Sequence, residues 1–189
     1  MIRSFIQSKG GQHRFETASL GQFLMQQIRK IWTSYTVLSP TANILLSDVI
    51  GHQLINTQLL ADQVSANGYL TVVPDLFFGN SVPLNSPAGF DIFEWLRDFP
   101  PERIDTVIQS TIEYLKISEG ITTIAAAGYC FGGKHVVRFL GKGASVGYAA
   151  HRSMVDEVEF AGIKGPLSIS AADKFNSAYI IIGFLFIAM

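Results

Sequence analysis

From residue 42 onward, short apolar runs typical of buried strands alternate with longer segments typical of helices. Strands that alternate with helices of ten or more residues are joined by crossovers, which implies a parallel sheet. Most of the runs are continuously apolar, as expected of strands covered on both faces. The predicted strands are 43–46, 69–73, 121–126, 145–150 and 167–171, and the predicted helices are 54–66, 101–119 and 132–140. The sequence therefore predicts an α/β fold, a three-layer α/β/α sandwich with a mostly parallel sheet.

The loops at the carboxyl ends of these strands are where such sheets bind ligands. They are predicted at 47–53, 74–80, 127–133, 150–155 and 172–177. Residues 79–89, which hold two prolines between two glycines, are expected to form a loop. Upstream of the regular pattern, residues 22–32 place apolar side chains at helical spacing and predict a short amphipathic helix.

The charge of the chain argues against one class of partner. Fourteen Lys and Arg residues nearly balance fifteen Asp and Glu residues, so bulk electrostatics give no case for binding nucleic acid. Residues 1–40 differ, because they hold five basic residues and one acid. We expect residues 1–33 to be an atypical basic N-terminal extension. A basic start that is poor in acids also fits a mitochondrial presequence, an alternative to the cytoplasmic location that we expect.

Cysteine and histidine usage excludes several kinds of site. The single cysteine, Cys130, rules out an internal disulfide and any multi-cysteine zinc site. The four histidines follow no recognised metal-ligand spacing, so we expect neither a metal nor a cofactor. The longest apolar run, 178–189, has 12 residues and is too short to span a bilayer as a helix. Such an apolar tail is expected to favour self-association.

One carboxyl-edge loop carries a chemical signature. Gly128-Tyr129-Cys130-Phe131-Gly132-Gly133 lies between a predicted strand and a predicted helix, in the nucleophile-elbow pattern with cysteine in place of serine. Small residues two before and two after Cys130 avoid clashes in this strained turn. The backbone N–H of Phe131 and the helix dipole can then stabilise an oxyanion and favour a thiolate. The alternative is a small buried cysteine in a glycine-rich turn.

Further motifs accompany the elbow in a fixed order. They are Leu46-Ser47-Asp48-Val49-Ile50-Gly51-His52, Ala61-Asp62-Gln63, Ala66-Asn67-Gly68-Tyr69, Pro74-Asp75-Leu76-Phe77, Lys134, Ala150-His151 and Pro166-Leu167-Ser168-Ile169-Ser170-Ala171-Ala172. Together they make the sequence resemble the dienelactone hydrolase family of the α/β-hydrolase superfamily, in particular its fungal branch. The resemblance implies a partial α/β-hydrolase domain over 34–177, followed by the apolar tail 178–189. It also implies hydrolysis of small carboxylic esters or lactones by a Cys-His-Asp triad.

The resemblance also implies roles for individual residues. Cys130 is expected to be the nucleophile, and the N–H groups of Phe131 and Val49 are expected to form the oxyanion hole. Asp48 matches the acidic position beside the resting thiol. The acid of the triad is expected after the last predicted strand, where Asp173 is the only acid.

The C-terminal end departs from the family. The triad order along the chain is nucleophile, acid, histidine, yet no histidine follows Asp173. We therefore expect an incomplete C-terminal end of the fold, through an altered gene model or a natural truncation, and little or no turnover. A second interpretation is a catalytically dead hydrolase-like protein that binds a small molecule or a partner. A third is a redox-sensitive thiol at Cys130.

Other polar residues fall at the same sheet edge. His151 ends a strand there and is the best remaining candidate to aid proton transfer. His52, at the start of the first helix, is expected to have a capping or loop role beside the cleft. Asp75 is expected to be a structural loop acid that lines it. His135 lies five positions after Cys130, so it should face away from the nucleophile and be solvated.

Overall fold

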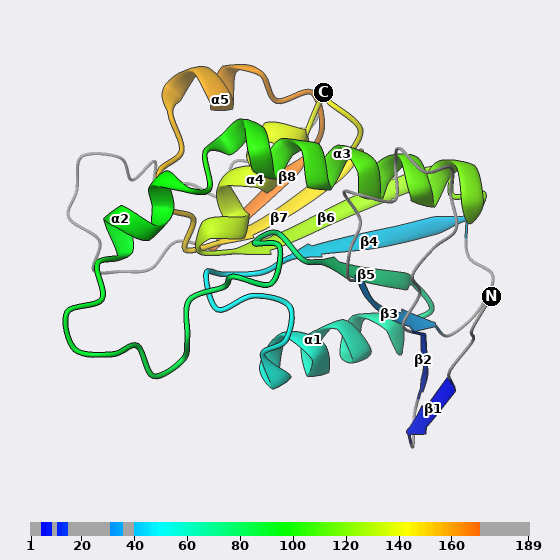
Figure 1. The fold of residues 1–189 in the computed structure, drawn as a ribbon. Helices are drawn as coiled ribbons and strands as arrows, with labels where there is room; N and C mark the ends of the chain where they lie inside the picture. The colour runs from blue at the N-terminus through cyan, green and yellow to red at the C-terminus, as the bar shows by residue number, and fades with distance from the viewer. Residues whose placement is uncertain (1–4, 9–10, 15–30, 36–39, 171–189) are drawn as a thin grey trace.

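The structure is a computed structural model that describes residues 5–8, 11–14, 31–35 and 40–170 (Figure 1). Its strands form one sheet in the order β1-β2-β3-β5-β4-β6-β7-β8. The strands are β1 (Phe5–Ser8), β2 (Gly11–Arg14), β3 (Ile31–Tyr35), β4 (Thr41–Leu46), β5 (Leu70–Pro74), β6 (Thr123–Tyr129), β7 (Val146–Ala150) and β8 (Leu167–Ser170). Strands β5, β4, β6, β7 and β8 pair in parallel. The predicted mostly parallel sheet is confirmed.

Helices cover both faces of this sheet. They are α1 (Ile55–Ser65), α2 (Ile92–Arg97), α3 (Pro101–Ser118), α4 (Phe131–Phe139) and α5 (Glu157–Ala161). Helices α3 and α4 lie on one face and α1 lies on the other (Figure 1). This arrangement is the predicted three-layer α/β/α sandwich.

The longest helix follows directly from its sequence. Pro101 is its first residue, where the missing N–H of proline costs nothing. Its apolar side chains recur every three or four residues and are buried in the main core against the sheet; they include Ile104, Val107, Ile108, Ile112 and Leu115. The short helices α2 and α5 were not predicted. They depend on caps, because Asp91 accepts hydrogen bonds from the N–H groups of Phe93 and Glu94 and Asp156 begins a capping box.

Burial differs along the sheet. Strand β5 is buried throughout and β4 almost throughout, as predicted for strands covered on both faces. Strand β6 instead alternates between buried and half-buried residues, and β8 alternates between half-buried and exposed ones. The half-buried Ala127 and Tyr129 of β6 lie on the α1 side, where they pack against a small cluster that includes Ala61. Within the described residues, α1 therefore leaves the β6–β8 half of this face partly exposed.

The N-terminal part of the sheet corrects one prediction. The predicted helix at 22–32 ends in strand instead, because Ile31 and Trp32 belong to β3, and its other residues lie outside the described residues. Strand β3 pairs antiparallel with β5 and places Trp32 opposite Val73, a long-range pairing that overrides the local helical spacing. The proposed boundary between 33 and 34 also falls inside β3. Among the described residues, no helix has the length and hydropathy needed to cross a membrane.

Candidate active site

Cys130 occupies the turn between the end of β6 and the start of α4. Its backbone angles are φ 51° and ψ −113°, a conformation that residues with a Cβ rarely adopt. Its N–H donates to the carbonyl of Ala150 at 3.1 Å, and its own carbonyl accepts from the N–H of Gly133 at 3.1 Å. The side chain is half-buried. The strained strand-to-helix turn expected from the sequence is therefore present at Cys130.

Two glycines make this turn possible. A Cβ on Gly128 would lie 2.5 Å from the carbonyl oxygen of Gly132. A Cβ on Gly132 would lie 2.2 Å from the carbonyl oxygen of Leu46. Since neither distance leaves room for an atom, the start of α4 lies directly against the end of β4.

The loop after β4 begins beside the elbow. Strands β4 and β6 pair in parallel with Leu46 opposite Gly128, so Val49 and Cys130 follow at the same edge of the sheet. The carboxylate of Asp48 accepts from the N–H of Ile50 at 2.9 Å. No described residue accepts a hydrogen bond from the N–H of Val49 or of Phe131. Within the described part of the chain both amides can donate to a bound oxygen, and their role as an oxyanion hole stays a prediction.

His52 and Asp75 lie together at this edge. His52 is in the turn before α1, three residues ahead of the helix, and not in the helix itself. Its Nδ1 is 3.5 Å from Oδ1 of Asp75, and both side chains are buried. The same Oδ1 accepts from the N–H of Phe77 at 3.1 Å. Asp75 thus contacts both its own loop and His52, and its predicted place in the lining of the cleft stays a prediction.

His151 is exposed at the end of β7. Its φ is 34°, and its N–H donates to the carbonyl of Ser170 at 2.8 Å. Its ring centroid is 6.4 Å from that of Tyr129, the residue before Cys130. Burial, with a smaller contribution from Tyr148, raises the pKa of Tyr129. Asp173 lies outside the described residues. In the described part of the chain, no group of three or more His, Cys, Asp and Glu residues could hold a metal ion.

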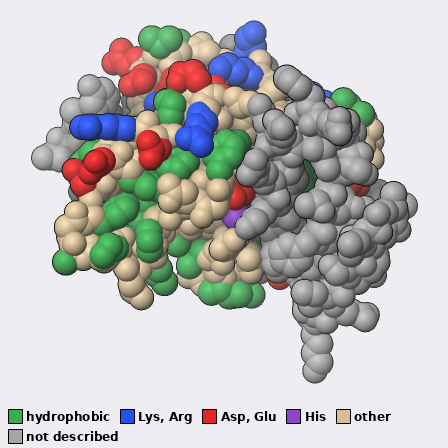
Figure 2. Space-filling model, viewed as in Figure 1, with side chains coloured by type: hydrophobic (Ala, Val, Ile, Leu, Met, Phe, Trp, Pro, Cys, Tyr) green, Lys and Arg blue, Asp and Glu red, His purple; other side chains and the backbone are tan. Residues whose placement is uncertain are grey.

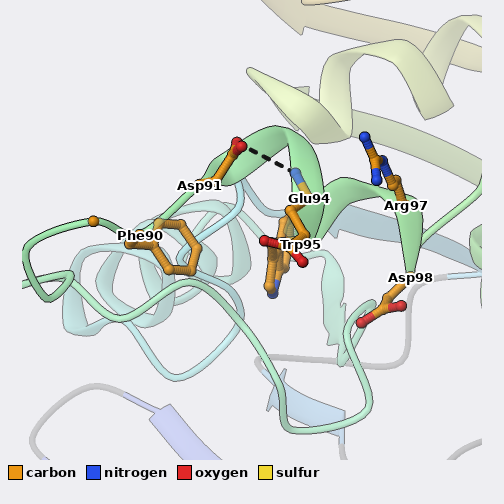
Figure 3. A pocket seen from close by; sticks show the side chains of 7 residues that line it. Phe90, Asp91, Glu94, Trp95, Arg97 and Asp98 are labelled. Atoms are coloured by element: carbon orange, nitrogen blue, oxygen red, sulfur yellow. Dashed lines mark hydrogen bonds between the residues drawn. The ribbon is translucent and has the colours of Figure 1, made fainter.

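A pocket of about 540 Å³ lies around α2 (Figure 3). It is lined by Gly89, Phe90, Asp91, Glu94, Trp95, Arg97 and Asp98. None of the site residues expected from the sequence lines it. The ring of Trp95 packs 5.0 Å from that of Phe77, which in turn lies 5.2 Å from the ring of Phe131. Buried aromatic rings therefore connect the wall of this pocket to the residue that follows Cys130.

His135 is fully buried, so its predicted solvated position is wrong. Its Nδ1 is 3.4 Å from Oδ1 of Asp105 on α3, and its ring centroid is 5.1 Å from that of Phe131. The local spacing indicated only the direction of the side chain. It could not show that α3 would contribute Asp105 as a partner.

A network of charges ties α4 to its neighbours. Arg138 donates to both oxygens of Asp105 at 3.0 and 2.6 Å and to Glu159 of α5 at 2.5 Å. Lys134 pairs with Glu159 at 3.0 Å and also donates to the carbonyl of Met154. Basic and acidic side chains lie close together on the upper part of the molecule (Figure 2), where α3, α4 and α5 are found (Figure 1). The network fixes the helix that begins at the elbow.

This network predicts a pH dependence of stability. Burial lowers the pKa of His135 and outweighs the opposing effect of its hydrogen bond to Asp105. Burial alone would raise the pKa of Asp105, but hydrogen bonds from His135 and Arg138 hold it well below its ordinary value. For both groups the unfolded chain binds protons more readily. His135 therefore contributes its full stability above its unfolded pKa of about 6.5, and that contribution is lost as pH falls.

Urea unfolding between about pH 5.5 and pH 7.5 tests this expectation. The free energy of unfolding should fall toward acid, with a slope from His135 of at most about 1.4 kcal/mol per pH unit. His135→Phe should flatten the dependence in this window, because the ring remains and the titrating nitrogen is removed. An unchanged slope in the variant would contradict the assignment to His135.

Comparison with known proteins places the chain among hydrolases. Residues 34–178 match the model of the Dienelactone hydrolase family. "Hydrolase tropI" of Talaromyces stipitatus is 40% identical over 174 residues, which cover 86% of this chain and 68% of that protein. The "Carboxymethylenebutenolidase homolog" of Homo sapiens is 32% identical over 158 residues, which cover 82% of this chain and 64% of that protein. The chain thus spans about two thirds of the length of these relatives.

A solved structure shares the fold. A cold-adapted esterase from an Arctic intertidal metagenomic library matches with a TM-score of 0.61 at 10% identity. The match covers 89% of this chain and 76% of the esterase. At this identity the likeness shows the fold alone, and that fold agrees with the sandwich described above.

Proposed function

The chain belongs to the dienelactone hydrolase family, and we propose that it cleaves small carboxylic esters or lactones with Cys130 as the nucleophile. Family membership and the hydrolase relatives support hydrolysis. The observation that best supports this role for Cys130 is its strained backbone conformation. Cys130 is half-buried and has a φ of 51°. It lies in a strand-to-helix turn, immediately before the N-terminus of a nine-residue helix. Strain of this kind is concentrated at functional sites.

The proposed chemistry proceeds in two steps. The thiolate of Cys130 attacks the carbonyl carbon, and the N–H groups of Phe131 and Val49 stabilise the resulting oxyanion. Collapse of this intermediate releases the alcohol and leaves a thioester on Cys130. Water then hydrolyses the thioester and frees the acid. In the family this second step needs a histidine oriented by an acid, for which we propose Asp173. We further propose that Asp48 lies beside the resting thiol.

A pre-steady-state experiment tests this function. The chain is mixed with p-nitrophenyl acetate and the release of p-nitrophenolate is followed. We expect a burst of up to one equivalent, because acylation of Cys130 releases p-nitrophenolate before water hydrolyses the thioester. Peptide mass analysis should locate the acetyl group on Cys130. A burst with the acetyl group elsewhere, or no burst at all, would overturn the proposal.

A second candidate function is binding without turnover. It is the alternative if the chain lacks the base that deacylation needs, since removing a triad member costs several orders of magnitude in rate. The partner would be a small carboxylic ester or lactone held at the same sheet edge. Saturable binding of a non-reactive ester analogue by a chain that shows no burst would support this function over the first.

The wider organisation of the chain is also a proposal. The family match over 34–178 supports a hydrolase-like domain at 34–177. We propose a basic extension at 1–33 before it and a separate tail at 178–189. We propose a cytoplasmic location, with a mitochondrial one as the alternative. Self-association through 178–189 is a separate proposal. Sedimentation velocity of the full chain and of a chain ending at 177 would test it, because only the full chain should associate.

A further inference from the structure

The loop that carries Val49 rests against the loop after β5 at three points. The carbonyl of Val49 accepts from the N–H of Val82 at 2.9 Å. Gly51 adopts φ 90°, and a Cβ there would lie 2.8 Å from Cβ of Ser81, so the two backbones are in close contact. His52 makes the third point through its Nδ1, 3.5 Å from Oδ1 of Asp75. The position of the Val49 amide therefore depends on the loop after β5.

Asp75 connects this loop to the elbow. It is 6% exposed, and its Oδ1 faces both the N–H of Phe77 and the ring of His52. Phe77 is fully buried, and its ring is 5.2 Å from that of Phe131. The same ring lies 3.6 Å from where a Cβ of Gly51 would be. The carboxylate of Asp75 therefore contacts two groups. One is His52, on the loop that carries the Val49 amide. The other is the backbone of Phe77, whose ring packs against Phe131.

The second oxygen of Asp75 adds to this argument. Oδ2 is buried and has no hydrogen-bond partner among the described residues. A buried carboxylate with an unsatisfied oxygen is costly, so packing alone does not explain an acid at this position. An acid is explained if its charge is needed to hold the imidazole of His52 in one orientation.

We propose that Asp75 and His52 form a positioning pair that sets the Val49 amide for the oxyanion formed at Cys130. The inference rests on the proposed function, since it assigns the pair to that reaction. In this proposal neither Asp75 nor His52 contacts the reacting atoms. The pair acts through the backbone of 48–52, which it holds at the end opposite Asp48.

The proposal predicts that two reactions of the same thiol will respond differently. Acetylation by p-nitrophenyl acetate passes through an oxyanion, so it should slow about 10- to 100-fold when the Val49 amide is displaced. Alkylation by iodoacetamide forms no oxyanion, so its rate should stay the same. A merely structural role would change both rates, or neither, and would leave their ratio unchanged.

Substitutions at His52 provide the test. His52→Phe keeps an aromatic ring and removes the nitrogen that faces Asp75, so it should show the full loss in acetylation. His52→Asn keeps a donor close to the position of Nδ1 and should retain most of the acetylation rate. Circular dichroism and thermal melting of each variant confirm that it folds before its rates are compared.

Substitutions at Asp75 test whether the two residues act as a unit. Asp75→Asn keeps an oxygen to accept from Phe77 and removes the charge, so it should lose acetylation as His52→Phe does. The double variant should be no slower than either single variant. Asp91→Asn is the matched control, because Asp91 also accepts from the N–H two residues ahead but does so at the start of α2.

The outcomes separate the two proposals. A parent chain that is alkylated at Cys130 yet shows no acetylation burst would overturn the proposed function, and the positioning pair with it. A normal burst in the parent that survives both His52→Phe and Asp75→Asn would overturn the pair alone. Equal losses of acetylation and alkylation would also overturn it, because the effect would then lie at the thiol.

Discussion

Replacing Gly132 by alanine is expected to destabilise the protein by at least about 4 kcal/mol, or to prevent folding altogether. The new Cβ would lie 2.2 Å from the carbonyl oxygen of Leu46 and 2.7 Å from that of Ser47. Both obstacles are backbone atoms at the end of β4, a central strand bonded on both sides. Neither side can yield without separating α4 from the sheet. The free energy of unfolding in urea measures the effect.

Gly162→Ala is the matched control for this substitution. Gly162 ends α5 at φ −83°, a conformation open to alanine, and the nearest atom to a Cβ there is 3.5 Å away. We expect its stability to change by less than about 1 kcal/mol, with a small gain from the stiffer unfolded chain. If Gly132→Ala melted at the temperature of this control, the close contact between α4 and β4 would be refuted.

The central strands and the elbow could be predicted because their signals are local. Apolar runs bounded by glycine and proline gave the five parallel strands to within a few residues. The glycines around Cys130 are explained by contacts that the turn itself creates, as the 2.5 Å approach at Gly128 shows. In these segments a few consecutive residues determine the conformation, so the sequence was sufficient.

Features that depend on distant parts of the chain could not be predicted in this way. Residues 31–35 form a strand because Trp32 pairs with Val73, about forty residues later in the chain. The burial of His135 depends on Asp105, which sits on a different helix. The contact between His52 and Asp75 requires the loops after two neighbouring parallel strands to meet. The residues were visible in the sequence, but their pairing followed only from the topology.

Cys130→Gly is expected to abolish the acetylation burst and, at the same time, to leave a more stable protein than Cys130→Ala. Both variants remove the thiol, so the burst rate should fall about 10³-fold or more. Their stabilities should differ because φ at this position is 51°. Alanine retains the strain of that conformation, which is of order 1–3 kcal/mol, whereas glycine adopts it readily. The greater flexibility of glycine in the unfolded chain offsets part of this gain, so we expect a net advantage of about 1 kcal/mol.

The two measurements separate the chemistry from the backbone. If Cys130→Gly melts no higher than Cys130→Ala, the strain at this turn does not exceed the entropic cost of glycine, and the observation that supports the nucleophile loses its force. If either variant keeps the burst, the nucleophile lies elsewhere. We expect the burst to be lost in both variants and the melting temperature to be higher for glycine than for alanine. That result would mean that a side chain at this turn lowers the stability of the protein and is needed for the reaction. A residue that serves packing alone would not be retained at such a cost.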